Sequence, residues 1–117
     1  MTEDELKARF KSWALAILKF TAHLPKTSEY RAVRNQIIRS ATSSAANYRA
    51  ACRGKSNADF INKLKIVEEE LDESLFWLEI IVGLDDTWRP PITPLYKEGN
   101  ELLSITVASI KTLRKKS

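Results

Sequence analysis

Residues 39–56, RSATSSAANYRAACRGKS, decide which fold the chain adopts. Small residues fill the first half of this stretch and arginines recur in the second, a composition that suits a flexible linker, a phosphate-binding loop or a closely packed helix. Apolar and small residues recur through the stretch and its N-terminal side at steps of three and four: Tyr30, Val33, Ile37, Ala41, Ser44 or Ala45, Tyr48 and Cys52. Because this spacing places side chains on one face of a helix, it predicts a helix over about residues 28–53.

Three other segments have the same amphipathic spacing. The sequence therefore predicts four helices, over about residues 3–23, 28–53, 57–83 and 94–115. Short connections between successive helices favour an all-α fold, an antiparallel up-down-up-down four-helix bundle. The chain has 117 residues, enough for one hydrophobic core, so residues 1–117 are predicted to form a single domain.

Glycine and proline mark several predicted helix ends. Gly54 and Gly83 are expected to end the second and third helices, because glycine adopts the left-handed conformation without steric cost. Thr93 and Pro94 predict the start of the last helix, since proline at the first helical position lacks only an N–H that needs no partner there. Residues 85–91, DDTWRPP, are accordingly predicted to be a loop.

Positive and negative charges are separated along the chain, whose net charge is +4. Residues 26–55 carry seven basic residues and one acidic residue, whereas residues 56–87 carry two basic and nine acidic residues. The two segments can pair with each other, or each can bind a separate partner. Because the second and third helices are antiparallel neighbours, we expect structural ion pairs among Arg34, Arg39, Glu70 and Glu73.

The other basic residues are candidates for binding phosphate. At about 100° per residue, several arginines of the second helix lie within an arc of about 80°, away from its apolar face. Arginine rows of this kind can follow a phosphate backbone through bidentate contacts, and a second basic cluster stands at the C-terminus. We predict nucleic-acid contacts from both groups: Arg31, Arg49, Arg53, Lys55, Lys111, Arg114, Lys115 and Lys116.

No pattern in the sequence predicts an enzyme. Di-iron sites in four-helix bundles need Glu-x-x-His motifs, but His23 is the single histidine and no glutamate lies three residues before it. Cys52, the single cysteine, lies on the apolar face of its predicted helix with no histidine nearby in sequence, which favours a buried apolar role. We therefore expect no catalytic residue, no metal site and no cofactor.

The sequence also predicts a cytoplasmic protein without a membrane partner. A single cysteine cannot form an internal disulfide, which suits a reducing compartment. No apolar run reaches the roughly 18 residues of a membrane span. The N-terminal stretch MTEDELKARF lacks the basic flank and apolar run of a secretory signal.

Several large apolar residues lie outside the stripes that would form the core of a bundle. On the third predicted helix, a second apolar stripe lies roughly 140° from the first. Exposed apolar stripes usually mark partner surfaces, and self-association into a closed, symmetric assembly is the commoner reason for them. The predicted interface of a homo-oligomer consists of Ile66, Trp77, Ile80 and Leu84.

Residues 36–79, QIIRSATSSAANYRAACRGKSNADFINKLKIVEEELDESLFWLE, resemble the signature of the four-helix-bundle proteins encoded in intervening sequences of bacterial 23S ribosomal RNA. That family is similar to the accessory variability determinant of diversity-generating retroelements, a basic, barrel-shaped homopentamer that binds nucleic acid and a reverse transcriptase. The resemblance therefore implies a four-helix bundle, a pentameric assembly, RNA or DNA as ligand and a reverse transcriptase as a candidate partner.

Two hypotheses of different classes follow. The first is a non-enzymatic nucleic-acid-binding homo-oligomer, in which Arg49 and Arg53 contact phosphates. The second is a self-assembling scaffold or protein-interaction module that binds no nucleic acid, in which the same arginines stabilise the assembly. The sequence leaves both roles of these arginines open.

Overall fold

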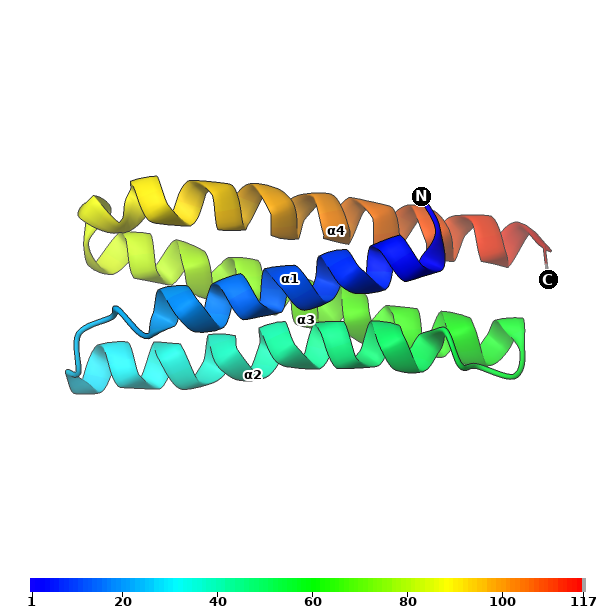
Figure 1. The fold of residues 1–117 in the computed structure, drawn as a ribbon, viewed down its shortest axis with the longest axis horizontal. Helices are drawn as coiled ribbons and strands as arrows, with labels where there is room; N and C mark the ends of the chain where they lie inside the picture. Colours follow the sequence, from blue (N-terminus) through cyan, green and yellow to red (C-terminus); the bar gives the residue numbers. More distant parts are fainter. Residues whose placement is uncertain (117) are drawn as a thin grey trace.

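The structure, a computed structural model, describes residues 1–116 and consists of helices packed side by side (Figure 1). Four of them are long: α1 (Glu3–Thr21), α2 (Ser28–Ala51), α3 (Asn57–Leu84) and α4 (Arg89–Lys116). A short 3-10 helix, η1 (Asp86–Trp88), joins α3 to α4, and no strand occurs within residues 1–116. The prediction of an all-α fold is confirmed.

Successive helices run in opposite directions along an elongated body of 47 × 21 × 20 Å (Figure 1). Neighbours in sequence pack against each other, and α4 packs back against α1, which closes the predicted up-down-up-down bundle. The start of α1, the end of α4 and the α2–α3 turn lie toward one end of the bundle, which we call the termini end. The α1–α2 connection and η1 lie at the other, which we call the aromatic end.

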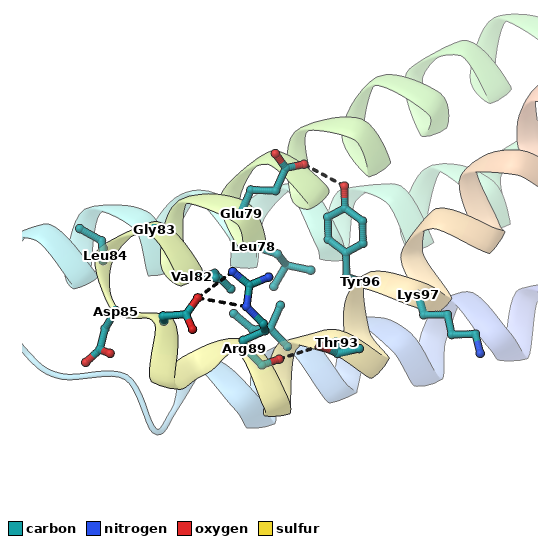
Figure 2. Close-up of a pocket in the computed structure, with 12 residues that line it drawn as sticks. Leu78, Glu79, Val82, Gly83, Leu84, Asp85, Arg89, Thr93, Tyr96 and Lys97 are labelled. Carbon is teal, nitrogen blue, oxygen red and sulfur yellow. Dashed lines mark hydrogen bonds and ion pairs between the residues drawn. The ribbon is translucent and has the colours of Figure 1, made fainter.

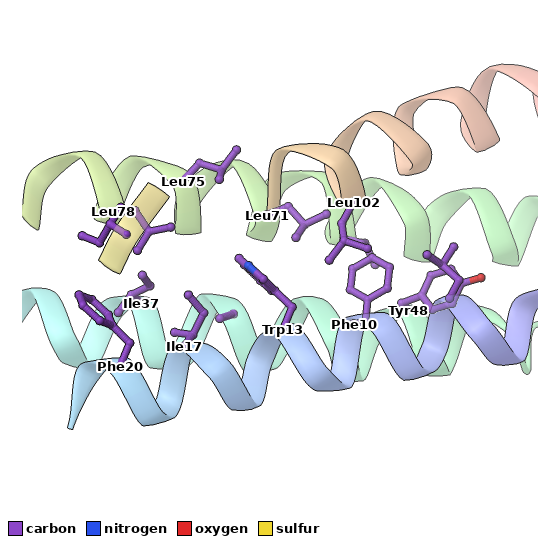
Figure 3. Packing of buried hydrophobic residues seen from close by; sticks show 14 of the residues in the cluster. Phe10, Trp13, Ile17, Phe20, Ile37, Tyr48, Leu71, Leu75, Leu78 and Leu102 are labelled. Carbon is purple, nitrogen blue, oxygen red and sulfur yellow. The ribbon is translucent and has the colours of Figure 1, made fainter. Parts of the chain in front are cut away.

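Apolar side chains from all four helices meet along the bundle axis (Figure 3). Near the termini end, the rings of Phe10 and Tyr48 stack with their centroids 4.8 Å apart and their planes 11° apart. This stack joins α1 to α2. The largest buried side chains of the core include Phe10, Ile17, Ile37, Leu64, Leu71, Leu78, Ile81 and Leu102.

Burial raises the pKa of the Tyr48 hydroxyl above its ordinary value near 10. The folded protein therefore holds this proton more tightly than the unfolded chain does. As the pH rises past about 10, the unfolded chain loses the proton first, so we expect stability to fall by about 1.4 kcal/mol per pH unit from this one group. Urea unfolding between pH 9.5 and 11 of the wild type and Tyr48→Phe tests this, because the phenylalanine keeps the stack without the proton; parallel pH profiles would contradict it.

Three aromatic rings close the aromatic end of the bundle. Trp88 of η1 donates a hydrogen bond from Nε1 to the Tyr30 hydroxyl at 3.2 Å. The Trp88 ring also meets Phe20 edge-on, with the centroids 5.8 Å apart. These contacts tie η1 to both α1 and α2, so the short α3–α4 connection packs against the core through Trp88.

A glycine allows α1 and α4 to approach closely. A Cβ atom on Gly99 would lie 2.8 Å from the Trp13 ring and 3.1 Å from Leu75, closer than packed carbon atoms tolerate. Trp13 is itself held in place, since its Nε1 donates a hydrogen bond to the Leu95 carbonyl at 2.9 Å. Gly99 is therefore required by packing in the middle of a helix, where glycine has an intrinsic cost.

Small polar residues let α2 and α3 approach in a similar way. Ser40 and Ser74 are fully buried, and a hydrogen bond of 2.7 Å joins their hydroxyl oxygens across the two helices. The Ser74 hydroxyl also donates to the Glu70 carbonyl at 2.8 Å, so both buried hydroxyls have a hydrogen-bond partner. The serine-rich part of residues 39–56 thus lies inside a helix and against α3.

The predicted start of the last helix, at residue 94 with a Thr93 cap, is wrong. The helix α4 begins at Arg89 and includes Pro90 and Pro91, and Thr93 lies inside it, donating from Oγ1 to the Arg89 carbonyl at 2.8 Å. Prolines are tolerated in a first turn because the N–H groups there have no intrahelical acceptor. Most of residues 85–91 are therefore helical.

Neither glycine ends its helix through a left-handed conformation, because no glycine within residues 1–116 has a positive φ. The helix α2 ends at Ala51, and Gly54 is needed for space, since a Cβ there would lie 3.1 Å from the Ala51 carbonyl oxygen. Gly83 lies within the last turn of α3. That helix ends at Leu84, where Asp85 turns extended and its carboxylate accepts a hydrogen bond from the Thr87 N–H.

Candidate nucleic-acid interface

The predicted phosphate-binding residues form two groups at the termini end, and Arg31 lies apart from both. Arg49, Arg53 and Lys55 lie at and just beyond the C-terminal part of α2, beside the α2–α3 turn. The second basic group lies on the last turns of α4, which reach the same end of the bundle (Figure 1). The exposed basic members of that group are Lys111, Arg114, Lys115 and Lys116.

Arg31 does not join these groups. It lies in the first turn of α2, where its guanidinium donates to the Lys26 carbonyl at 3.3 Å. Eighteen residues of helix separate Arg31 from Arg49, which is about 27 Å at 1.5 Å per residue. Arg31 and Arg49 lie on the same face of α2, as the sequence indicates, but they are too far apart to belong to one compact site.

A groove of about 510 Å³ runs between α1 and α2 near the termini end. Two lysines of α1 and two arginines lie along its walls, and three alanines line it between them: Lys7, Lys11, Arg49, Arg53, Ala8, Ala45 and Ala46. The sequence analysis missed the two lysines. Their four-residue spacing was visible, but only the packing of α1 against α2 shows that they face Arg49 and Arg53.

The arginines of the bundle differ in whether a carboxylate neutralises them. Arg9 of α1 forms ion pairs with two glutamates of α4, Glu98 at 2.6 Å and Glu101 at 3.1 Å. Hydrogen bonds to Glu98 raise the pKa of the Arg9 guanidinium. Arg49 and Arg53, by contrast, form no ion pair with any residue in the range 1–116.

Arg39 pairs with the acidic helix. Its guanidinium lies 3.1 Å from the Glu70 carboxylate and also contacts Glu73. The hydrogen bond to Glu73 is the largest of the contacts that raise the pKa of Arg39. Arg34 is half-buried on α2 and forms no ion pair inside the described part of the chain. The α2–α3 ion pairs are thus centred on Arg39.

The predicted oligomer interface divides into exposed and covered residues. Ile66 and Leu84 of α3 are exposed, 38% and 45% respectively. Trp77 and Ile80 are half-buried and pack against the core, and the Trp77 indole donates to Glu73 at 3.1 Å. Apolar exposure also occurs elsewhere on α3 and on α1, at Phe76, Leu15 and Leu18.

A second groove, of about 750 Å³, lies between α3 and α4 toward the aromatic end (Figure 2). A hydrogen bond of 2.8 Å from the Tyr96 hydroxyl to the Glu79 carboxylate spans its two helices. Arg89 lies in it and pairs with Asp86 at 2.7 Å. Its cationic groups are few, so this groove does not extend the basic surface of the termini end.

The structure offers no alternative site for metal chemistry or a membrane span in the region it describes. No group of three or more His, Cys, Asp or Glu side chains within residues 1–116 is arranged to hold a metal ion. Among the helices of that range, none combines the length and apolar character needed to cross a bilayer. Cys52 is half-buried, and burial raises the pKa of its thiol.

Fold and surface together define an antiparallel four-helix bundle protein with exposed basic side chains at one end, Arg49 and Arg53 among them. Residues 5–108 match the family of 23S rRNA-intervening sequence proteins, and the chain belongs to this family. The family resemblance carried by residues 36–79 is thereby confirmed.

A solved structure is similar over almost the whole bundle. It is the crystal structure of a protein of unknown function from the S23 ribosomal protein family of Bacteroides thetaiotaomicron. The two chains share 30% sequence identity with a TM-score of 0.83, and the similarity covers 91% of this chain and 98% of the other. No curated protein is significantly similar to this chain in sequence.

Proposed function

We propose that this protein is a non-enzymatic, nucleic-acid-binding homo-oligomer that contacts RNA or DNA through its termini end. One observation supports this above others: Arg49 and Arg53 have no carboxylate partner in residues 1–116, whereas Arg9, Arg39 and Arg89 are paired. An arginine that no carboxylate neutralises keeps its donors available for phosphate.

The surrounding charges favour the same ligand. Lys55 in the α2–α3 turn and Lys111, Lys115 and Lys116 near the end of α4 are exposed at this end of the bundle. Phosphate contacts supply most of the sequence-independent affinity of a nucleic-acid-binding protein, and they release counterions when they form. Binding to RNA or DNA is therefore expected to weaken steeply as salt increases.

The test is the double variant Arg49→Glu/Arg53→Glu. Charge-assisted hydrogen bonds contribute about 1.5 kcal/mol each, so we expect about a 100-fold loss of affinity for a mixed-sequence RNA or DNA. The dependence of log affinity on log salt should also become shallower by about two phosphate contacts. Fluorescence anisotropy at two salt concentrations measures both quantities.

A matched control separates the site from net charge. Lys19→Glu/Lys26→Glu makes the same change in charge near the aromatic end, where both lysines are exposed. We expect this control to retain most of the wild-type affinity. Equal binding by the wild type and the arginine variant would reject the site, and equal losses in both double variants would reduce it to an effect of net charge.

The second candidate function is a self-assembling scaffold without nucleic-acid binding. It is favoured by the exposed apolar residues of two helices, Leu15 and Leu18 on α1 and Ile66, Phe76 and Leu84 on α3. Both candidate functions include an oligomer interface, which we propose is formed by Ile66, Trp77, Ile80 and Leu84. Light scattering tests the oligomeric state. A monomer at micromolar concentration, with and without RNA, would contradict self-association in both proposals.

The family resemblance supplies the most specific form of the proposal. It favours a pentamer, a cytoplasmic setting and, where the gene neighbours one, a reverse transcriptase as partner. Co-purification of this chain with a reverse transcriptase encoded beside it, lost in Arg49→Glu/Arg53→Glu, would support that partnership.

A further inference from the structure

Two grooves at the termini end share one residue. The α1–α2 groove is lined by Lys7, Lys11, Arg49 and Arg53. Another groove, of about 420 Å³, lies between the end of α2 and the start of α3, and Arg53 lines it too. Its other basic residues are Lys55 and Lys63, both exposed, while Asp59 adds one carboxylate. Arg53 therefore joins basic grooves on two sides of α2.

From this path we infer the ligand class: a single strand of RNA or DNA, held through its phosphates, crosses the end of α2 from one groove to the other. The inference rests on the proposed nucleic-acid binding and adds which form of nucleic acid binds and where it runs. The strand would enter beside Lys11, pass Arg53 and leave beside Lys63.

The spacing of the cations suits a backbone. Lys7 and Lys11 are four residues apart on α1, and Arg49 and Arg53 are four residues apart at the end of α2. Four residues of helix advance about 6 Å, so each wall presents two cations along the groove. Lys7 shares its charge with Asp4 at 3.1 Å, a solvent-exposed pair of low strength, whereas Lys11 forms no ion pair within residues 1–116.

The residues between these cations offer no platform for stacking bases in the α1–α2 groove. Ala8, Ala45 and Ala46 line it, and none of its lining residues is aromatic. Single-strand binders that contact bases use aromatic rings as stacking platforms, and base edges are read by hydrogen-bonding side chains. A groove of methyl groups between cations favours contacts with phosphates, so we expect binding to depend little on base identity.

The turn of the path disfavours a duplex. The two grooves lie on different faces of the end of α2 and meet at Arg53, and a helix with its side chains is about 10 Å across. Duplex DNA has a persistence length of about 50 nm and cannot follow such a turn, whereas a single strand can. Preference for single strands is thus a direct consequence of the two grooves being used together.

The test compares three probes of equal length by fluorescence anisotropy: a mixed-sequence single strand, its duplex, and a single strand in which abasic sites replace most bases. We expect the single strand to bind at least about tenfold more tightly than the duplex at equal salt. The abasic strand should bind within about threefold of the normal one, because phosphates supply the contacts.

Single substitutions then test the two ends of the path. Lys11→Gln and Lys63→Gln should each lower single-strand affinity and reduce the salt slope by about 0.7, the value for one phosphate on a single strand. Lys19→Gln, an exposed lysine of α1 far from both grooves, is the matched control and should change neither. Thermal unfolding of each variant checks that the bundle is intact.

The outcomes separate this inference from the proposed function. If Arg49→Glu/Arg53→Glu abolishes binding but the duplex binds as tightly as the single strand, or Lys11→Gln and Lys63→Gln bind normally, nucleic-acid binding stands and the path is rejected. Loss of binding by the abasic strand also rejects it, because bases would then be contacted. If no probe binds even at low salt, both the path and the proposed function fail.

Discussion

Phe10→Ala is expected to lower the free energy of unfolding by about 3–5 kcal/mol. Phe10 is fully buried and its ring stacks on Tyr48 (Figure 3). Removing the ring leaves a cavity between α1 and α2 and ends the stack, and both losses add to the transfer free energy of the missing atoms. Since domains of this kind have a total stability of about 5–15 kcal/mol, the variant is expected to lose about a fifth or more of it.

Urea unfolding followed by circular dichroism measures this loss as a shift of the midpoint. Leu15→Ala is the matched control, because Leu15 is an exposed apolar residue on the same helix. It should change stability by less than about 0.5 kcal/mol. A loss below about 1 kcal/mol for Phe10→Ala would show that the Phe10–Tyr48 stack is not part of the tightly packed core.

Two glycine-to-alanine substitutions are expected to have opposite effects. Gly99→Ala should destabilise the protein by about 1–3 kcal/mol, because the added Cβ would lie 2.8 Å from the Trp13 ring. The Trp13 ring cannot move aside freely while its hydrogen bond to the Leu95 carbonyl holds. This steric cost exceeds the gain in helix propensity of about 1 kcal/mol that alanine brings.

Gly83→Ala is the control with the same chemical change. No atom lies within 4 Å of a Cβ built on Gly83, and its backbone is helical without a positive φ. Alanine should therefore stabilise this turn of α3 by up to about 1 kcal/mol. Thermal unfolding of both variants beside the wild type decides the matter: a melting temperature that rises for both would contradict the close contact between α1 and α4.

Hydrophobic spacing was sufficient to predict the four helices and their antiparallel order. The ends of α1, α2 and α3 lie within two residues of the predicted positions. The start of α4 was predicted five residues too late, since three prolines within Arg89–Pro94 read as a break. In the bundle, Pro90 and Pro91 occupy the first turn, where the missing N–H groups cost little.

Contacts between helices were harder to predict than the helices themselves. The sequence indicated Arg49 and Arg53 as candidates, but nothing in it showed that Lys7 and Lys11 lie across a groove from them. That contact depends on how α1 and α2 are rotated about their axes. The need for glycine at position 99 could not be predicted either, because it depends on the ring of Trp13, which is distant in sequence.

The position of the chain termini decides how this protein should be labelled. Both termini lie beside the α2–α3 turn, at the end where we place the nucleic acid (Figure 1). A purification tag or fluorophore on either end of the chain would extend from the end of the bundle that holds the α2–α3 turn, where an acidic tag would compete with the strand for the basic side chains. The exposed α1–α2 connection, around His23 and Lys26 at the far end, is the better place for a dye or a surface tether.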